Sequence, residues 1–271
     1  MANLGRLWLL LVVAFLYLPV AVMVAMAFNA SPLYTLPFEY SPRWFIDLSG
    51  NDRLITAGIN SVVIALATMA IATVLGTAAA VALSRATFRG KDFLQVMLLP
   101  PIAIPWLITG TAMLVFFFWT GIGRGLHAMI LGHVALAIPY VVLVVGTGLK
   151  SIRVDLEEAA MSLGSTPLHA FAAVTLPALA PSIVAAALFA FAVSLDQFVV
   201  SYFLATPGVS TLPVEIYTAI RKGFTPEINA ISTILLGASM ILVLTFAALS
   251  NMGAAARGPV AAGGKPGGVA R

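Results

Sequence analysis

Six long apolar runs dominate the sequence and restrict how the chain can fold. They cover residues 7–28, 59–83, 93–119, 126–149, 178–204 and 228–249. A bilayer core of about 30 Å is crossed by about 20 apolar residues in a helix. Backbone N–H and C=O groups must find partners within such a segment, because hydrocarbon offers none. We therefore predict an all-α membrane protein with six spans.

The overall composition supports a membrane location. The sequence is 61% apolar and 9% charged, whereas a soluble domain has about 45–50% apolar and about 25% charged residues. The first apolar run contains Ala25-Met26-Ala27, which resembles a signal-peptide cleavage site. Because this run is longer than the core of about 7–15 residues in such a peptide, we expect it to be retained as the first span.

The positions of Lys and Arg predict the orientation, because basic residues concentrate in short cytoplasmic loops. With a cytoplasmic N-terminus, nine of the 14 basic residues fall on the cytoplasmic side and five on the other. The cytoplasmic set is Arg6, Arg85, Arg89, Lys91, Lys150, Arg153, Arg257, Lys265 and Arg271, and the external set is Arg43, Arg53, Arg124, Arg221 and Lys222. Both termini are therefore predicted to be cytoplasmic.

Local patterns divide the chain into a six-span domain, 1–252, and a tail, 253–271, rich in Gly, Ala and Pro and predicted to be disordered. Three prolines interrupt the third run, Pro100, Pro101 and Pro105. Packing against neighbouring helices alone could accommodate them, and the functional alternative is that the third span is kinked where it lines a pathway. In the second run, Ala72, Gly76 and Ala80 recur every four residues and predict close contact with another helix.

The loop 150–177, between the fourth and fifth runs, is predicted to form a helix, a sharp bend and a second helix. Its first part carries three acids, and negative charge suits the start of a helix. Gly164 can take the left-handed conformation that ends a helix, and Ser165 or Thr166 can cap the next one. Pro177 is expected to end the second helix before the fifth span.

A structured loop of this length indicates that a partner docks on it, since connections between helices usually have about 2–8 residues. A helix lying passively on anionic lipid would carry Lys and Arg on its polar face. This loop leads instead with Asp155, Glu157 and Glu158. Docking is therefore favoured over passive contact with lipid.

Residues 158–177, "EAAMSLGSTPLHAFAAVTLP", resemble the EAA loop of the permease subunits of bacterial ABC importers. The matching positions are Glu158, Ala159, Ala160, Gly164, Val174, Leu176 and Pro177, with Val174 where Ile is more usual. Four further segments resemble the second permease subunit of spermidine/putrescine-type transporters. They are 17–29, 132–142, 194–203 and 211–236, so the likeness runs nearly from end to end.

The resemblance implies a six-span type I ABC importer permease fold with cytoplasmic coupling helices in a bacterial inner membrane. It implies a second permease subunit, two ATP-binding subunits and a periplasmic solute-binding protein as partners, besides membrane lipid. Basic residues scattered among loops, rather than gathered in one stripe, argue against nucleic acid. Coupling to the ATP-binding subunit would involve Glu158, Ala159, Ala160, Gly164, His169, Leu176 and Pro177.

The family also implies a small solute as cargo, and one branch suggests a polyamine. Asp196 lies in the fifth apolar run, where a buried carboxylate is costly unless it is paired or hydrated. It could meet a cationic cargo near the external gate, or make a structural hydrogen bond. Gln197 stands where a second acid is expected, which weakens the inference of a polycation. Trp106 and Tyr140 are further candidates for the substrate path.

Several chemistries lack their residues in this sequence. The two Gly-Lys pairs, at Gly90 and Gly264, are followed by Asp and Pro rather than Ser or Thr, so no phosphate-binding loop of its own is predicted. The energy for transport must therefore come from a partner or from an ion gradient. The resemblance assigns ATP hydrolysis to a partner subunit, so the chain is not expected to be an enzyme. His127 and His133 lie about 120° apart around a helix, and Cys is absent, so neither a metal nor a cofactor is expected.

Three alternative functions remain open from the sequence. The same fold could carry an opine, an iron complex or an inorganic anion. An ion-coupled secondary carrier would usually show more spans, internal repeats and acids at the bilayer midplane. A scaffold without transport activity would leave the kinked third span unexplained.

Overall fold

The computed structural model describes residues 2–31, 35, 37–98, 100–222 and 226–255. These residues fold into helices joined by loops, and the only β-pairing among them consists of isolated bridges, Asn29 with Tyr40 and Thr206 with Val209. The prediction of an all-α protein is confirmed.

Five helices are long and apolar enough to cross a membrane, and a bent pair gives six when it is counted as one span. The long helices are α1 (Ala2–Met26), α3 (Asp52–Arg85), α7 (Leu126–Ser151), α10 (Leu176–Leu195) and α13 (Glu227–Ala255). The bent span consists of α4 (Lys91–Met97), α5 (Pro100–Ala103) and α6 (Trp106–Trp119). The shorter elements are α2 (Arg43–Ser49), α8 (Asp155–Ser162), α9 (Pro167–Ala170), the π-helical turn η1 (Phe171–Thr175), α11 (Phe198–Leu204) and α12 (Leu212–Lys222).

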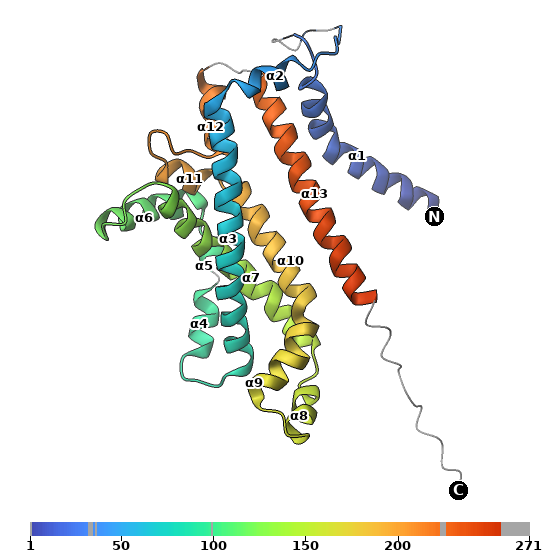
Figure 1. Ribbon diagram of the computed structural model, residues 1–271, viewed down its shortest axis with the longest axis vertical. Helices are drawn as coiled ribbons and strands as arrows, with labels where there is room; N and C mark the ends of the chain where they lie inside the picture. Colours follow the sequence, from blue (N-terminus) through green and yellow to red (C-terminus); the bar gives the residue numbers. More distant parts are fainter. Residues whose placement is uncertain (1, 32–34, 36, 99, 223–225, 256–271) are drawn as a thin grey trace.

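The third span is kinked, with an angle of 108° between its two halves. Pro100 begins α5, and Pro105 stands immediately before α6. A proline has no N–H to donate and disfavours helical backbone in the residue before it. Helix α6 consequently runs across the direction of α3 instead of along it (Figure 1).

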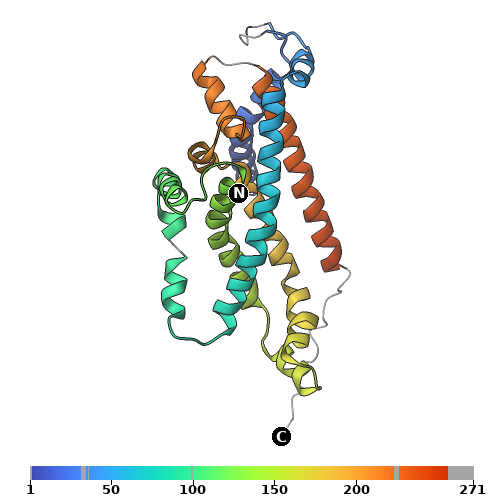
Figure 2. The same ribbon diagram turned by 60° about the vertical axis from the view of Figure 1, so that its left-hand side comes forward.

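The centre of the bundle is formed by α3, α7 and α10, and α3 makes its most extensive contact with α7. Helix α3 runs along almost the whole described bundle (Figure 1), and a turned view keeps it beside α7 and α10 (Figure 2). Ala72 and Ala80 are buried in this contact. A Cβ added to Gly76 would lie 2.6 Å from Cγ1 of Val141. The small residues therefore allow the close approach that their spacing predicts.

Helix α1 contacts α13 near α2 and then diverges from the bundle (Figure 1). None of its apolar window is buried within the chain. Its apolar side chains are therefore left for lipid or for another subunit.

Two predicted boundaries differ from the structure. The apolar run predicts a fifth span over 178–204, but the helix ends at Leu195 and α11 is a separate element. Gln197 makes the break, because its side chain accepts the N–H of Val199 at 3.2 Å and so caps α11. Helix α13 continues to Ala255, so the first three residues of the predicted tail are helical, and 256–271 lie outside the described residues.

Replacing Gly76 by Leu should destabilise the bundle, because the new side chain would overlap Val141. Overpacking of this kind costs about 1–3 kcal/mol, so the melting temperature of the purified protein in detergent should fall. Gly237→Leu in α13 is the matched control, because nothing lies within 4 Å of a Cβ at that position. Equal melting temperatures for the two variants would contradict the proposed packing.

Candidate functional site

The loop between α7 and α10 forms the helix, bend and helix that its sequence predicts. Helix α8 ends at a turn in which Gly164 has φ +95°, a left-handed conformation that favours glycine. Thr166 caps α9, accepting the N–H of His169 at 3.3 Å. The loop lies at the lower end of the bundle in Figure 1, and we call α8, the turn and α9 the docking elbow.

The prediction that Pro177 ends the second helix is wrong. One helix runs from Pro167 to Leu195 and includes α9, the π-helical turn and α10. The wider turn, Phe171–Thr175, comes directly before the first turn of α10, where Pro177 lies. A π-helical turn shifts the hydrogen-bond register, so the missing N–H of Pro177 is accommodated without a break. Leu176 and Pro177 therefore belong to the helical shaft and not to the elbow.

The elbow exposes both polar and apolar side chains. Among the predicted docking residues, Glu158, Ala159, Gly164 and His169 are exposed, and Ala160 is half-buried. Two leucines that the sequence analysis did not single out are also exposed, Leu163 at 90% and Leu168 at 79%. Large apolar side chains so open at one end of a bundle indicate a surface that another protein covers. The sequence feature that could have indicated these two leucines is their position on either side of the Gly164 turn.

Glu157 and Glu158 are adjacent in α8, but Glu157 is half-buried and Glu158 is exposed. Glu157 turns inward and accepts two hydrogen bonds from Arg85, the last residue of α3, at 2.9 and 3.2 Å. Its carboxylate also accepts the hydroxyl proton of Thr175, which is buried in η1. The paired side chains of Arg85 and Glu157 are only 24% and 15% exposed. We call this group the α3 clasp, and it ties the elbow to α3 while Glu158 remains free to meet a partner.

A second ion pair in the loop is open to solvent. Nη2 of Arg153 lies 2.5 Å from Oδ2 of Asp155, and the side chains are 77% and 54% exposed. The hydrogen bond from Arg153 holds the pKa of Asp155 below its ordinary value. Because exposed pairs are screened by water and salt, this one contributes little to stability.

Asp196 lies at the break between α10 and α11 and lines a cavity of about 430 Å³ between α1, α10, α12 and α13. Among the described lining residues it is the only charged one, and Ser232 and Ser239 are the only other polar ones. Asp196 itself is exposed, so its carboxylate can stay hydrated while it borders the cavity. A positively charged group that entered the cavity could pair with this carboxylate.

The other two predicted path residues lie elsewhere in the single chain. Tyr140 of α7 packs on Phe189 of α10 with ring centroids 5.2 Å apart. Trp106 begins α6, directly after Pro105, and is 36% exposed. Neither residue lines the Asp196 cavity, so one chain does not bring the three together.

His133 joins three helices across the break. Its ring is buried, with Nδ1 2.8 Å from Oγ of Ser194 in α10 and Nε2 3.0 Å from Oγ of Ser201 in α11. His127, six residues earlier in α7, is exposed, and its Nε2 contacts the carbonyl of Ile122. His133 is thus a structural link that holds α11 in place after the interruption at Asp196.

His133→Ala should lower the stability of the protein by about 2–4 kcal/mol, because it leaves a cavity and two buried hydroxyl groups without their partner. His127→Ala serves as the control on the same helix and should change stability by less than about 1 kcal/mol. Thermal unfolding in detergent, followed by circular dichroism, measures both. A loss no larger at position 133 than at 127 would contradict the proposed link.

These features define a class of protein: a multi-pass membrane protein with a structured helical elbow at one end of its bundle. Residues 72–255 match the family described as "Binding-protein-dependent transport system inner membrane component". The chain belongs to this family, the membrane-spanning permeases of ABC importers.

Similar curated proteins agree with this assignment and with the resemblance noted in the sequence. The putrescine transport system permease protein PotI of Escherichia coli K12 is 39% identical over 238 residues, covering 85% of this chain and 84% of that protein. The spermidine/putrescine transport system permease protein PotC of Haemophilus influenzae is 34% identical over 238 residues, covering 88% and 92%. PotC of Escherichia coli K12 is 33% identical over 231 residues, covering 85% and 88%.

Solved structures confirm the type I ABC importer permease fold. A chain of the bacterial ABC transporter that imports the acidic polysaccharide alginate superposes with a TM-score of 0.71 at 17% identity, covering 93% of this chain and 98% of that one. A chain of the MetNI methionine transporter in an inward-facing conformation superposes with a TM-score of 0.64 at 20% identity, covering 74% and 95%. At these identities the likeness concerns the fold alone.

Proposed function

We propose that this permease forms, with a second permease subunit, the path of a polyamine of the putrescine and spermidine kind, and that partner ATP-binding subunits drive it. The observation that carries the proposal is the docking elbow, which places Glu158, Leu163 and Leu168 on an exposed, rigid surface. The names of the similar permeases support the polyamine as cargo. A periplasmic solute-binding protein would deliver that cargo, as the family description implies.

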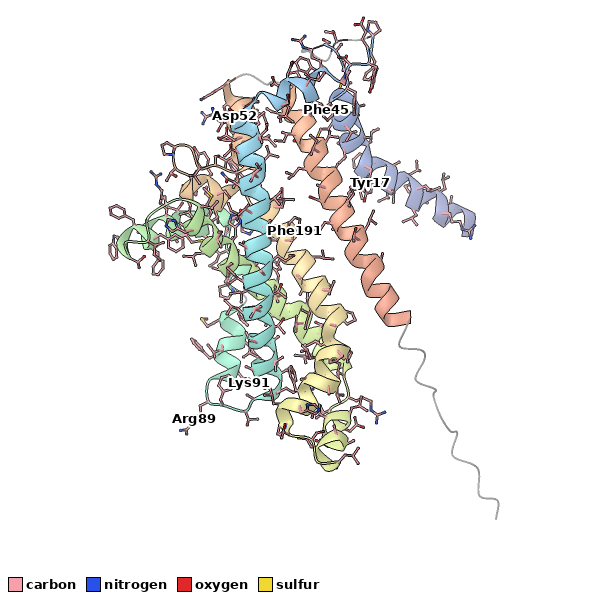
Figure 3. All side chains as sticks on the ribbon, viewed as in Figure 1. Tyr17, Phe45, Asp52, Arg89, Lys91 and Phe191 are labelled. Atoms are coloured by element: carbon pink, nitrogen blue, oxygen red, sulfur yellow. The ribbon has the colours of Figure 1, made fainter. Side chains whose placement is uncertain are left out.

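The proposed orientation puts the elbow and both termini in the cytoplasm. Nine of the 14 basic residues fall on that side, as expected for cytoplasmic segments. Arg89 and Lys91 lie at the lower end of the bundle, as the elbow does, while Asp52 lies at the upper end (Figure 3). Helix α12 and the loop before it would then face the periplasm.

The shape of the elbow suggests how ATP-driven movement would enter the bundle. Because the helix is continuous from Pro167 to Leu195 over 29 residues, no flexible joint separates the elbow from the span. This helix is about 43 Å long at 1.5 Å per residue, and it ends next to Asp196. Closure of two ATP-binding subunits would therefore tilt α10 as a unit and change the cavity beside Asp196, which is a form of alternating access.

Two substitutions in the elbow should detach the ATP-binding subunit without preventing membrane insertion. Glu158→Lys reverses an exposed charge at the docking surface, and Gly164→Asp places a charged side chain in a left-handed turn that favours glycine. Co-purification of the ATP-binding subunit with the tagged permease measures the effect. Gly208→Asp is the matched control, since Gly208 has φ +81° and open space around it but lies in the loop before α12. Retained co-purification with both elbow variants would count against the docking role.

Asp196→Asn should reduce polyamine uptake by about tenfold or more, because a charge-assisted contact contributes about 1.5–3 kcal/mol. Asp196→Glu keeps the charge and should retain more activity. The assay is ATP-dependent uptake of labelled putrescine into vesicles holding the complete complex, with complex assembly checked by co-purification. Normal uptake by Asp196→Asn would overturn the cargo role, and uptake driven by an ion gradient without the ATP-binding subunit would indicate a secondary carrier.

A further inference from the structure

Helix α3 is an unbroken helix of 34 residues with no proline inside it. At 1.5 Å per residue it is about 51 Å long, longer than the hydrocarbon core of a bilayer. Asp52 marks its upper end, and Arg89 and Lys91 lie just beyond its lower end (Figure 3). A straight helix without a hinge transmits a displacement at one end to the other.

The lower end of α3 is fixed to the docking elbow by the α3 clasp. Arg85 binds both carboxylate oxygens of Glu157, 72 residues further along the chain. The same carboxylate accepts from Thr175 in the π-helical turn. The pair is half-buried, with 24% and 15% of its side chains exposed, so separating the two charges is opposed by three hydrogen bonds that water replaces only in part. Movement of the elbow therefore carries the end of α3 with it.

The upper end of α3 is joined to α12 and the loop before it by an ion pair and two hydrogen bonds. Nε of Arg53 lies 2.6 Å from Oε2 of Glu215, and the side chain of Glu215 is only 9% exposed. The side chain of Arg53 is 61% exposed, so water screens this pair more than the Arg85–Glu157 pair. The hydroxyl of Ser61 accepts the N–H of Leu212, the first residue of α12, at 2.8 Å. Asn60 donates to the carbonyl of Ser210 at 3.0 Å. Within the described residues, α3 alone forms ion pairs to distant elements at both of its ends.

Helix α12 is itself in contact with the Asp196 region. Three of its residues, Leu212, Pro213 and Ile216, line the Asp196 cavity. The ring of Tyr217 packs on Phe198 of α11 with centroids 4.9 Å apart. Displacement of α12 would therefore reshape both the wall of that cavity and the helix that follows Asp196.

We propose that α3 is the rigid link between the docking elbow and α12, with the Arg85–Glu157 and Arg53–Glu215 pairs as its two joints. Through this link, binding of a loaded binding protein above α12 changes the state of an ATP-binding subunit on the elbow. The inference rests on the proposed function, because it requires an ATP-binding subunit at the elbow. By linkage, the coupling acts in both directions between the two sites.

The experiment breaks and restores each joint in the complete complex in liposomes. At the elbow, the variants are Arg85→Glu, Glu157→Arg and the double exchange, and the readout is the stimulation of ATP hydrolysis by loaded binding protein. Each single reversal should reduce that stimulation by at least about fivefold, while the ATP-binding subunit still co-purifies. The double exchange should restore most of it. At the upper joint, Arg53→Glu and Glu215→Arg should each reduce the stimulation, and the double exchange of Arg53 and Glu215 should restore most of it.

Matched controls lie beside each joint. Arg153 and Asp155 form an exposed pair within the loop, and Arg43 and Asp47 form one in α2 near the upper end. Neither pair connects α3 to another element. Arg43→Glu, outside the docking loop, should leave the stimulation unchanged. Arg153→Ala removes the exposed pair without reversing a charge in the docking loop, and should leave the stimulation nearly unchanged. If a charge reversal prevents folding, Glu157→Gln and Glu215→Gln keep the shape of the side chain and test the same point.

The outcomes separate the inference from the function on which it rests. Assembled complexes that keep full stimulation after a joint is broken would overturn the link. So would control variants that lose as much stimulation as the joint variants. Failure of the unaltered permease to retain an ATP-binding subunit would overturn the proposed function itself, before any joint is tested.

Discussion

The close packing of α3 on α7 determines where the other elements of this permease can lie. Gly76 lets the backbone of α3 approach Val141 of α7. Gly148 of α7 likewise allows close contact with α10, because a Cβ added at Gly148 would lie 2.6 Å from Cβ of Ser182. Interiors this dense resist deformation, although packed helices can still slide past one another by small amounts. Helices α3, α7 and α10 therefore form the centre of the bundle, to which the elbow, α11 and α12 are attached by polar contacts.

Polar residues inside the bundle join helices that hydrophobic packing alone would leave free. His133 holds α10 and α11 together across the Asp196 break, and Glu157 holds the elbow to α3. Buried polar groups favour one arrangement, because any other would leave them without partners. The adjacent acids Glu157 and Glu158 show the resulting division: one fixes the elbow and the other faces outward.

Local features of this fold could be predicted from the sequence, whereas contacts between distant segments could not. The kink at Pro105 and the turn at Gly164 depend on the conformational limits of single residues. Pro177 was misread because a proline after a π-helical turn need not end a helix. The break at Gln197 does not follow from the sequence pattern. Asp196 and Gln197 are only two polar residues in a long apolar run, and they barely change its mean hydropathy. The pairing of Arg85 with Glu157 joins residues 72 positions apart, and neither residue alone indicates its partner.

Crosslinking from the elbow tests the central claim most directly, namely that this surface receives an ATP-binding subunit. The sequence contains no Cys, so Leu163→Cys, at a position with 90% exposure, offers a single attachment point for a photoreactive probe. Trp119→Cys, at the end of α6 with 85% exposure, gives the control. We expect the probe at position 163 of the assembled complex to form a conjugate with the ATP-binding subunit and the probe at 119 to form none. Conjugates from position 163 with phospholipid alone would contradict the account.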